Sequence, residues 1–313
     1  SFGKSFVNYV LKNIKNIKKI IVFSRDELKQ FEFNNEIDNK FKKKIRFFLG
    51  DIRDKERLIY AFQDVDIVIH AAALKQVPAA EYNPFEYIKT NVIGAQNLIT
   101  ACINQGVKKV IALSTDKACS PINLYGATKL CSDKLFISSN NLSGKNGTIF
   151  SVVRYGNVFA SRGSVIPFFI DLDKKKKPIT ITDKKMTRFN ISLEEAVKFV
   201  IDCLKNMKGG EIFVPKIPSY RILDLLNAIE KNPKFKVIGI RPGEKLHEEM
   251  ITESDSMNSE EFKNYFVIHP SYRKYKYNTK KIFSYNSLNN SKFLKSHEIK
   301  ALILKNLKDF PND

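Results

Sequence analysis

Long apolar runs, paired cysteines and metal-ligand patterns are all missing from this sequence of 313 residues. No run approaches the roughly 20 apolar residues that cross a bilayer, and no secretory signal is visible. The four cysteines and four histidines form no CxxC pair and show no metal-ligand spacing. We therefore expect no membrane partner, no bound metal, and reduced thiols in a cytoplasmic protein.

Acidic residues are also scarce: 33 Asp and Glu face 53 Lys and Arg, which gives a formal charge of +20. Such a charge first suggests nucleic acid as a partner. The lysines are scattered, however, and a run such as Lys174–Lys177 is typical of a solvated turn. No zinc-finger, RNP or helix-turn-helix pattern accompanies them. We predict no nucleic-acid partner, because an anionic small substrate needs only a few of these charges.

What the sequence does contain is an alternation of apolar strands and amphipathic helices. Continuous β-branched runs suit strands buried on both faces, and strands separated by helices form right-handed βαβ units. This predicts an α/β fold with a Rossmann-like, doubly wound parallel sheet and a smaller α/β lobe. Strands are expected at 18–23, 45–50, 65–73, 108–115 and 148–157, with helices at 51–63, 84–105 and 125–139.

The alternation of strands and helices becomes less regular after Asn157, and three regions are predicted. Residues 1–157 form the first domain, and 158–271 form mainly the smaller lobe, interleaved with the last elements of the sheet. Residues 272–313 are a polar extension that ends in one helix. The chain starts in what looks like the end of a glycine-rich turn with no strand before it, so we expect a truncated front.

The first strand carries signals of a dinucleotide cofactor. Gly3 would be the last glycine of G-x-G-x-x-G, although the first two are absent. About 20 residues later such a site meets the adenosine ribose, where an acid suits NAD and a basic group suits a 2′-phosphate. Arg25 can offer that phosphate a charged fork, with Lys29 one helical turn on. NADP is therefore preferred, although Asp26 and Glu27 remain possible ribose acceptors and Arg25 could be a surface residue.

Two later strand ends fit the same cofactor. Asp51 follows the second strand of this chain and could accept a hydrogen bond from an adenine amino group. The small residues 71–73 follow the next strand and let a cofactor approach the backbone closely. Both positions lie at the carboxyl edge of the predicted sheet, where such folds bind ligands.

The pair Tyr125 and Lys129 predicts proton chemistry. Residues four apart on a helix share a face, within about 6 Å between β-carbons. A phenol with a pKa near 10 is a poor base at pH 7, but an adjacent ammonium and a nicotinamide cation favour phenolate. The pair could therefore deprotonate an alcohol whose carbon loses hydride to NADP⁺. YxxxK alone is common, but here it follows a sheet strand and the cofactor signals.

Further motifs occur over about residues 1–270: SFGK, SRDELKQ, HAAALKQVPAAEYNP, STDKACSPINLYGATK, VVRYGNVFASRGSVIPFF, MTRF, GGEIFVPKIPS and IGIRPGEKLHE. Together they resemble the extended short-chain dehydrogenase/reductase superfamily. More narrowly, they are similar to its inverting UDP-N-acetylglucosamine 4,6-dehydratases, the type that opens pseudaminic-acid biosynthesis. Retaining relatives carry Asp-Glu where this chain has Asp116 and Lys117.

The resemblance implies an NADP-dependent lyase with two proton-handling pairs. Tyr125, supported by Lys129, deprotonates O4 while hydride leaves C4 for NADP⁺. Lys117 then takes the C5 proton, and Asp116, beside Thr115, protonates the departing C6 hydroxyl. Hydride returns to C6 and a proton returns to C5 from the opposite face. The product would be UDP-2-acetamido-2,6-dideoxy-β-L-arabino-hex-4-ulose.

These roles require two altered pKa values. Lys117 must be neutral to act as a base, so we expect its pKa to be depressed from about 10.4 by desolvation, by Lys129 and by the nicotinamide. The pKa of Asp116 must conversely be raised. The alternative is that Asp116 and Lys117 form a surface ion pair in a loop.

The resemblance also implies contacts to both ligands. The cofactor set is Ser1, Phe2, Gly3, Ser24, Arg25, Asp26, Glu27, Lys29, Asp51, Ile52, Ala72, Asn91, Tyr125, Lys129 and Val158. The UDP-N-acetylglucosamine set is Asn157 near the diphosphate, Val165 near the uracil, Arg188 and Arg241 on phosphates, Glu244 on the ribose, and Lys75 and Arg162 lining the cleft. A homo-oligomer is implied as well, with a hexamer as the candidate size.

Three alternatives stay open at this point. The first is a related nucleotide-sugar 4,6-dehydratase or C4 epimerase for capsule or lipopolysaccharide sugars, and the Asp116–Lys117 pair argues against the epimerase. The second is a non-catalytic NADP-binding regulator, which would have no need of Tyr125, Lys129 and that pair together. The third is a basic nucleic-acid binder, which steep salt dependence without UDP affinity would favour.

Overall fold

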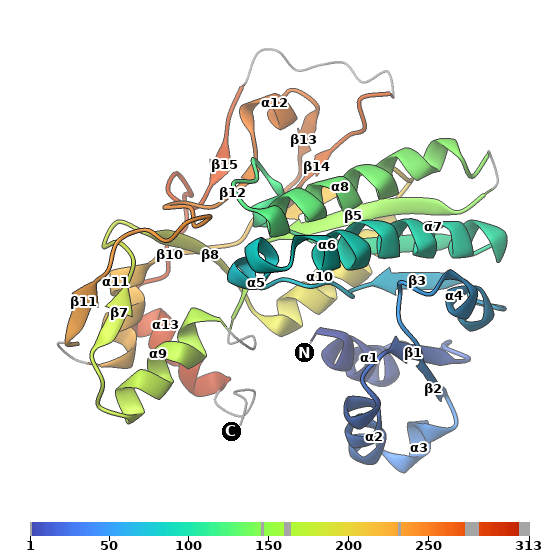
Figure 1. The fold of residues 1–313 in the computed structure, drawn as a ribbon, viewed down its shortest axis with the longest axis horizontal. Helices are drawn as coiled ribbons and strands as arrows, with labels where there is room; N and C mark the ends of the chain where they lie inside the picture. The colour runs from blue at the N-terminus through green and yellow to red at the C-terminus, as the bar shows by residue number, and fades with distance from the viewer. Residues whose placement is uncertain (1, 145–146, 160–163, 231–232, 273–281, 307–313) are drawn as a thin grey trace. The chain divides into compact units, whose positions relative to one another are not determined.

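A computed structural model describes residues 2–144, 147–159, 164–230, 233–272 and 282–306. The chain forms two compact units (Figure 1). The first comprises residues 1–114, 127–153 and 197–212, and the second comprises 115–126, 154–196 and 213–313. Each unit is thus built from segments far apart in the sequence. Among the described residues, no helix is both long and apolar enough to cross a bilayer.

The first unit begins with a small parallel pair of strands and its helices. Strand β1 (Ile20–Ser24) pairs in parallel with β2 (Ile45–Leu49). Helices α1 (Phe2–Asn13), α2 (Glu27–Glu36) and α3 (Asn39–Lys42) accompany them, drawn in blue in Figure 1. Side chains from α1 and α2, among them Leu11 and Phe33, form one apolar cluster with partly buried residues of both strands. Burial of this face fixes β1, and with it the position of the residues that follow.

The rest of the first unit is a parallel sheet with helices. Strands β3 (Ile67–His70), β4 (Lys109–Thr115) and β5 (Ile149–Tyr155) are adjacent in the order β5-β4-β3, and β3 and β4 run parallel. The last two residues of β5 belong to the second unit. Strand β5 is buried nearly throughout and β4 is buried over its middle, as their continuous apolar runs predict. The predicted Rossmann-like α/β fold is confirmed.

The helices of this sheet follow the predicted order with two departures, an unpredicted helix at Val77–Tyr82 and an interruption of the helix expected at 84–105. They are α4 (Lys55–Ala61), α5 (Val77–Tyr82), α6 (Pro84–Tyr87), α7 (Gly94–Asn104), α8 (Leu124–Ser138) and α10 (Leu193–Asn206). The single helix expected at 84–105 is instead α6, a π-helical turn at Ile88–Ile93 and α7. A π turn inserts an extra residue per turn, and such turns are frequent at functional sites.

The second unit holds several short strands. Strand β8 (Thr187–Ile191) lies between β10 (Ser219–Arg221) and β6 (Asn157–Val158), and β7 (Ile179–Ile181) pairs in parallel with β11 (Phe235–Val237). Figure 1 shows α9 (Val165–Lys174), α11 (Ile222–Ile229) and α13 (Ser296–Lys305) grouped beside β7 and β11. Their apolar faces meet in one core cluster, which includes Leu225, Leu226 and Ile299.

The remaining strands of the second unit include part of the polar extension. Strands β9 (Ile212–Pro215), β14 (Tyr265–Ile268) and β13 (Ser259–Glu261) are adjacent in that order, and α12 (Glu253–Ser256) follows β12 (Glu249–Ile251). Strand β15 (Tyr285–Asn286) pairs antiparallel with β12. The helix expected near the end of the chain is α13, and Leu294, Ile299 and Ile303 bury their side chains in the core.

Candidate active site

Asp116 and Lys117 form a single turn of 3₁₀-helix directly after β4. The Thr115 hydroxyl accepts a hydrogen bond from the Lys117 backbone N–H at 3.3 Å and donates one to Asp116 Oδ1 at 3.0 Å. Lys117 Nζ donates to the same Oδ1 at 3.1 Å. The side chain of Asp116 is 1% exposed and that of Lys117 23%. A surface ion pair does not fit this burial.

A second carboxylate beside Lys117 was not assigned by the sequence analysis. Glu248 Oε1 lies 3.0 Å from Lys117 Nζ and 3.9 Å from Arg188 Nε. Arg188 Nη2 in turn lies 3.3 Å from Glu244 Oε1. We call Asp116, Lys117, Glu248, Arg188 and Glu244 the charge network; all five belong to the second unit. The available signal for Glu248 was an acidic residue at the edge of the apolar strand EMI, inside the motif IGIRPGEKLHE.

Two carboxyl groups of the charge network, Asp116 and Glu248, have opposite pKa shifts. Burial raises the pKa of Asp116, and the nearby charge of Glu248 adds to the rise. The predicted direction for Asp116 is therefore confirmed. Burial alone would also raise the pKa of Glu248, but the cations of Lys117 and Arg188 outweigh it and lower that pKa. Two carboxyl groups whose pKa values are shifted in opposite directions thus flank the same amine, a typical arrangement for acid–base work.

The predicted pKa of Lys117 is wrong in direction. Burial of the ammonium does lower the pKa of Lys117, but the carboxylates of Asp116 and Glu248 more than offset it, and the pKa is raised. The prediction counted Lys129 and a nicotinamide as neighbours and did not foresee Glu248. In the structure as it stands, Lys117 is an ammonium hydrogen-bonded to two carboxyl groups.

Three carboxyl oxygens of the charge network are buried without a partner. Within the described part of the chain, Asp116 Oδ2, Glu244 Oε2 and Glu248 Oε2 find no hydrogen bond. A buried polar atom without a partner costs free energy, so such a group indicates a place for a ligand or a proton.

The space beside Asp116 Oδ2 depends on Gly156. A Cβ on Gly156 would lie 3.1 Å from Asp116 Oδ2 and 2.5 Å from the Cβ of Phe189. Glycine at this position therefore keeps room beside the free oxygen.

Tyr125 lies buried in the first turn of α8. The next residue must be glycine, because a Cβ on Gly126 would approach the Lys117 carbonyl oxygen to 2.2 Å. Tyr155 on β5 is a poor alternative base, since burial raises its pKa and the charge of Tyr125 adds to the rise. The start of α8 is thus fixed close to the backbone of Lys117.

Lys129 lies four residues beyond Tyr125 on the same helix. Its Nζ donates to the carbonyl of Leu113 on β4 at 2.8 Å. Burial lowers the pKa of Lys129, and the carboxylate of Asp133 opposes that shift. Lys129 belongs to the first unit, whereas Tyr125 and the charge network belong to the second. That the side chains of Asp116, Lys117, Tyr125 and Lys129 all face one sugar stays a prediction.

Several of the expected cofactor residues lie at the carboxyl ends of β1, β2 and β3. Gly3 is in the first turn of α1, and no atom lies within 4 Å of the position that a Cβ would take there. Arg25 is exposed after β1, with Nη1 3.7 Å from Asp51 Oδ2. Ala72 is exposed after β3. An open glycine, a small exposed residue and an exposed arginine fit a phosphate-bearing dinucleotide.

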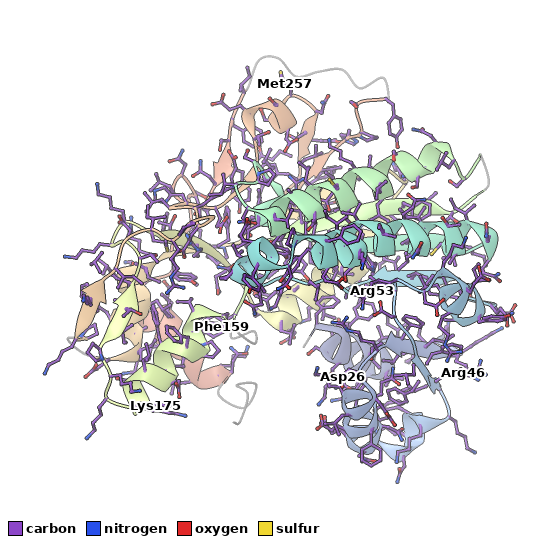
Figure 2. The ribbon with its side chains drawn as sticks, in the orientation of Figure 1. Asp26, Arg46, Arg53, Phe159, Lys175 and Met257 are labelled. Atoms are coloured by element: carbon purple, nitrogen blue, oxygen red, sulfur yellow. The ribbon has the colours of Figure 1, made fainter. Side chains whose placement is uncertain are left out.

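Other cofactor candidates already have partners within the protein. Asp26, labelled in Figure 2, caps α2 by accepting from the Lys29 N–H at 3.0 Å, and its carboxylate pairs with the Lys29 ammonium. Asp51 accepts from Arg53 Nη2 at 3.0 Å. Asn91, in the π-helical turn, hydrogen-bonds both backbone groups of Leu74 at 2.9 Å.

The remaining cofactor candidates are placed as follows: Ser24 ends β1, Glu27 begins α2, Ile52 is buried and Val158 ends β6. Phe2 begins α1, and Ser1 lies outside the described residues.

The expected substrate residues belong mostly to the second unit. Asn157 on β6 makes a side-chain hydrogen bond with Tyr220. Val165 begins α9, while Arg241 is exposed in a loop. Arg188 and Glu244 are brought together in the charge network. Lys75 is exposed in the first unit, and Arg162 lies outside the described residues.

Curated relatives match this chain over most of its length. A UDP-N-acetylglucosamine 4,6-dehydratase (inverting) from Campylobacter jejuni subsp. jejuni serotype O:23/36 is 59% identical, over 87% of this chain and 80% of that protein. A UDP-glucose 4-epimerase from Rickettsia bellii is 42% identical, over 97% of this chain and 92% of that protein. The motif resemblance predicted from the sequence is thereby confirmed.

Solved structures share the fold. Pen from Bacillus thuringiensis superposes with a TM-score of 0.90 at 38% identity and covers 99% of this chain and 95% of that one. DesIV, a dTDP-glucose 4,6-dehydratase from Streptomyces venezuelae solved with NAD bound, has a TM-score of 0.68 at 20% identity, over 78% of this chain and 83% of that one. A family model described as polysaccharide biosynthesis protein matches residues 1–270. The chain therefore belongs to the polysaccharide biosynthesis protein family.

Proposed function

We propose that this protein is an NADP-dependent, inverting UDP-N-acetylglucosamine 4,6-dehydratase. The observation that carries the proposal is the buried Asp116 side chain hydrogen-bonded at 3.1 Å to Lys117, at the carboxyl end of β4. A 4,6-dehydratase needs an acid for the C6 oxygen and a base for the C5 proton. The relative with the inverting activity in its name supports the same assignment.

The bound nicotinamide would supply the hydride acceptor, and this chain's residues handle the protons. Tyr125 takes the proton from O4 as the C4 alcohol becomes a ketone, which makes the C5 proton acidic. Lys117 accepts the C5 proton, and Asp116 donates a proton to the C6 oxygen, which leaves as water. The unpartnered Asp116 Oδ2 is the oxygen free to face that hydroxyl. Arg188 suits the diphosphate, because its planar fork can bond two phosphate oxygens.

A raised pKa of Lys117 is compatible with a role as base. The 3.1 Å hydrogen bond joins Lys117 Nζ to Asp116 Oδ1, so a single proton shared by the pair can move from the amine to the carboxylate. That transfer gives a neutral amine and a neutral acid, which are the forms that elimination requires. The pair therefore titrates as a unit, and its two apparent pKa values belong to both residues.

The function is tested by incubating the protein with UDP-N-acetylglucosamine and NADP⁺ in D₂O and following the sugar by NMR. We expect the C6 hydroxymethyl signals to be replaced by a methyl signal, with deuterium at C5 and a product of the L-arabino configuration. An epimerase would instead keep the hydroxymethyl group and change only the C4 signal. Retention of configuration at C5, or no reaction with intact UDP binding, would contradict the proposal.

The preference for NADP is tested by replacing Arg25 with alanine. Arg25 is exposed at the end of β1, and we propose that its guanidinium holds the 2′-phosphate. We expect Arg25→Ala to weaken NADP by about tenfold or more and NAD by less than about twofold, since NAD lacks that phosphate. Titration calorimetry with each cofactor measures both affinities. Arg46→Ala, which removes an exposed arginine of β2 (Figure 2), is the matched control. Equal losses for the two cofactors would refute the assignment.

Three further proposals rest on the resemblance. The product would enter pseudaminic-acid biosynthesis, the enzyme would act in the cytoplasm, and it would assemble as a homo-oligomer, with a hexamer as the size to test by light scattering. The four cysteines are free thiols, which is consistent with a reducing compartment.

A further inference from the structure

Glu248 is the one member of the charge network to which neither the motif resemblance nor the proposed chemistry gives a task. Its carboxylate is 3% exposed, and it stands between the amine of Lys117 and the guanidinium of Arg188. Burying an unpaired charge costs folding free energy. A carboxylate that pairs with both Lys117 and Arg188 is therefore a candidate for a functional role as well as a structural one.

The backbone around Glu248 is held on both sides. The Glu248 N–H donates to Ser287 Oγ at 2.9 Å, and the Ser287 N–H donates to the Glu248 carbonyl at 2.7 Å. Ser287 Oγ also shares a hydrogen bond of 2.7 Å with Thr187 Oγ1, next to Arg188. The carboxylate is therefore directed at Lys117 from a rigid position, as a preorganised electrostatic group must be.

We propose that Glu248 is a positioning residue for Lys117: its carboxylate holds the amine against Asp116 and stabilises the ammonium that forms when Lys117 accepts the C5 proton. This inference deepens the proposed function and rests on it. Glu248 acts through Lys117 and exchanges no proton with the sugar.

The change of charge during elimination explains why a carboxylate beside Lys117 would speed the step. The C5–H bond breaks, its proton goes to Lys117 Nζ, and its electron pair forms the C5–C6 double bond. The C6–O bond breaks, and the oxygen leaves as water with the proton of Asp116. A neutral acid and a neutral amine thus become a carboxylate and an ammonium. The Lys117 amine lies 3.1 Å from Asp116 and 3.0 Å from Glu248, so both carboxylates are placed to stabilise the ammonium that elimination produces.

Other groups near Lys117 do not supply the same effect. Among the described residues, Arg188 and the buried phenol of Tyr220 also act on Lys117, and the cation of Lys245 acts on Glu248. Arg188 is a cation and opposes a second positive charge, and burial raises the pKa of Tyr220, which keeps the phenol neutral. Among the described neighbours that act on the pKa of Lys117, Glu248 is therefore the group that stays negatively charged throughout the proposed step. Asp116 instead goes from neutral to negative.

The test compares Glu248→Gln, which keeps shape and removes charge, with Glu248→Asp, which keeps charge. Glu249→Gln is the matched control, because Glu249 is the adjacent carboxylate and bonds Ser120 and Ser284 instead of the charge network. The readouts are kcat and KM for UDP-N-acetylglucosamine across pH, UDP affinity, and titration of Lys117 by NMR of lysine-labelled protein, assigned with Lys117→Arg.

We expect Glu248→Gln to lower the pKa of Lys117 by about 1 to 3 units, as loss of an adjacent opposite charge does. The rising limb of the kcat profile should move to lower pH by the same amount, and the plateau of kcat should fall because a weaker base removes the proton more slowly. KM and UDP affinity should change by less than about twofold. Glu248→Asp should restore part of both shifts, and Glu249→Gln should match the wild type.

Two results would overturn the inference. One is an unshifted Lys117 titration in Glu248→Gln. The other is an equal loss of kcat in the Gln and Asp variants together with lost UDP affinity, which would mean a purely structural role. If the wild type forms no product, the proposed function fails separately, and the Lys117 titration alone decides whether Glu248 controls this amine.

Discussion

Replacing Lys117 with methionine is expected to stop dehydration while hydride still leaves C4. Methionine has a similar length and keeps the packing, but it has no amine to accept the C5 proton. Loss of a general base typically costs about 10²- to 10⁴-fold in rate, and we expect product formation to fall within that range. In the proposed mechanism the C4 oxidation uses Tyr125 and Lys129, so one equivalent of reduced cofactor should still appear when enzyme and substrate are mixed.

Two measurements separate the steps in this variant. NMR of the C6 protons reports elimination, and absorbance of the reduced nicotinamide in a single turnover reports oxidation. Lys216→Met is the matched control, because Lys216 is a partly buried lysine of the second unit that pairs with Glu261 at 2.7 Å. The Lys216→Met variant should form product at the wild-type rate. Unchanged product formation by Lys117→Met would show that another group is the base.

Replacing Tyr125 with phenylalanine should abolish the reaction at its first step. Without the phenol no group takes the O4 proton, so neither reduced cofactor nor product should form, and the loss should again reach about 10²- to 10⁴-fold. The two variants therefore differ in one readout: Lys117→Met accumulates reduced cofactor, whereas Tyr125→Phe does not.

Tyr155 provides the control for this substitution. Its phenol is buried and electrostatically coupled to Tyr125, and burial raises its pKa. Tyr155→Phe should keep at least about a tenth of the wild-type rate, because a neutral phenol is a poor base. A result in which Tyr155→Phe loses the oxidation and Tyr125→Phe keeps it would reverse the two roles.

The parts of the fold predicted from sequence are those with long, repeated patterns. Strand β5 is buried along nearly its whole length and β4 over its middle, so their apolar runs are continuous and unambiguous. Strands β8 and β12 to β15 were not predicted, because β8 mixes polar and apolar residues and β12 to β15 have two to four residues each, without a longer apolar run around them. The 84–105 segment has helical periodicity throughout, and the pattern alone does not reveal the π-helical turn at Ile88–Ile93.

The candidate site shows a similar division. Asp116 and Lys117 are adjacent in sequence, so their proximity follows from the chain itself. Glu248 comes from a distant segment and contacts Lys117 only through the tertiary fold. For the same reason the pKa of Lys117 was predicted in the wrong direction: the sum of charges around an amine depends on neighbours that sequence spacing does not give.

The pairing of β12 with β15 constrains how this protein can evolve. The family match ends at residue 270, yet Ser287 fixes the peptide groups of Glu248, which lies inside the match. A chimera that joined residues 1–270 to an unrelated tail would keep every recognised motif and still leave this acid unanchored. Substitutions after residue 270 are therefore expected to disturb a carboxylate of the charge network, although no recognised motif lies there.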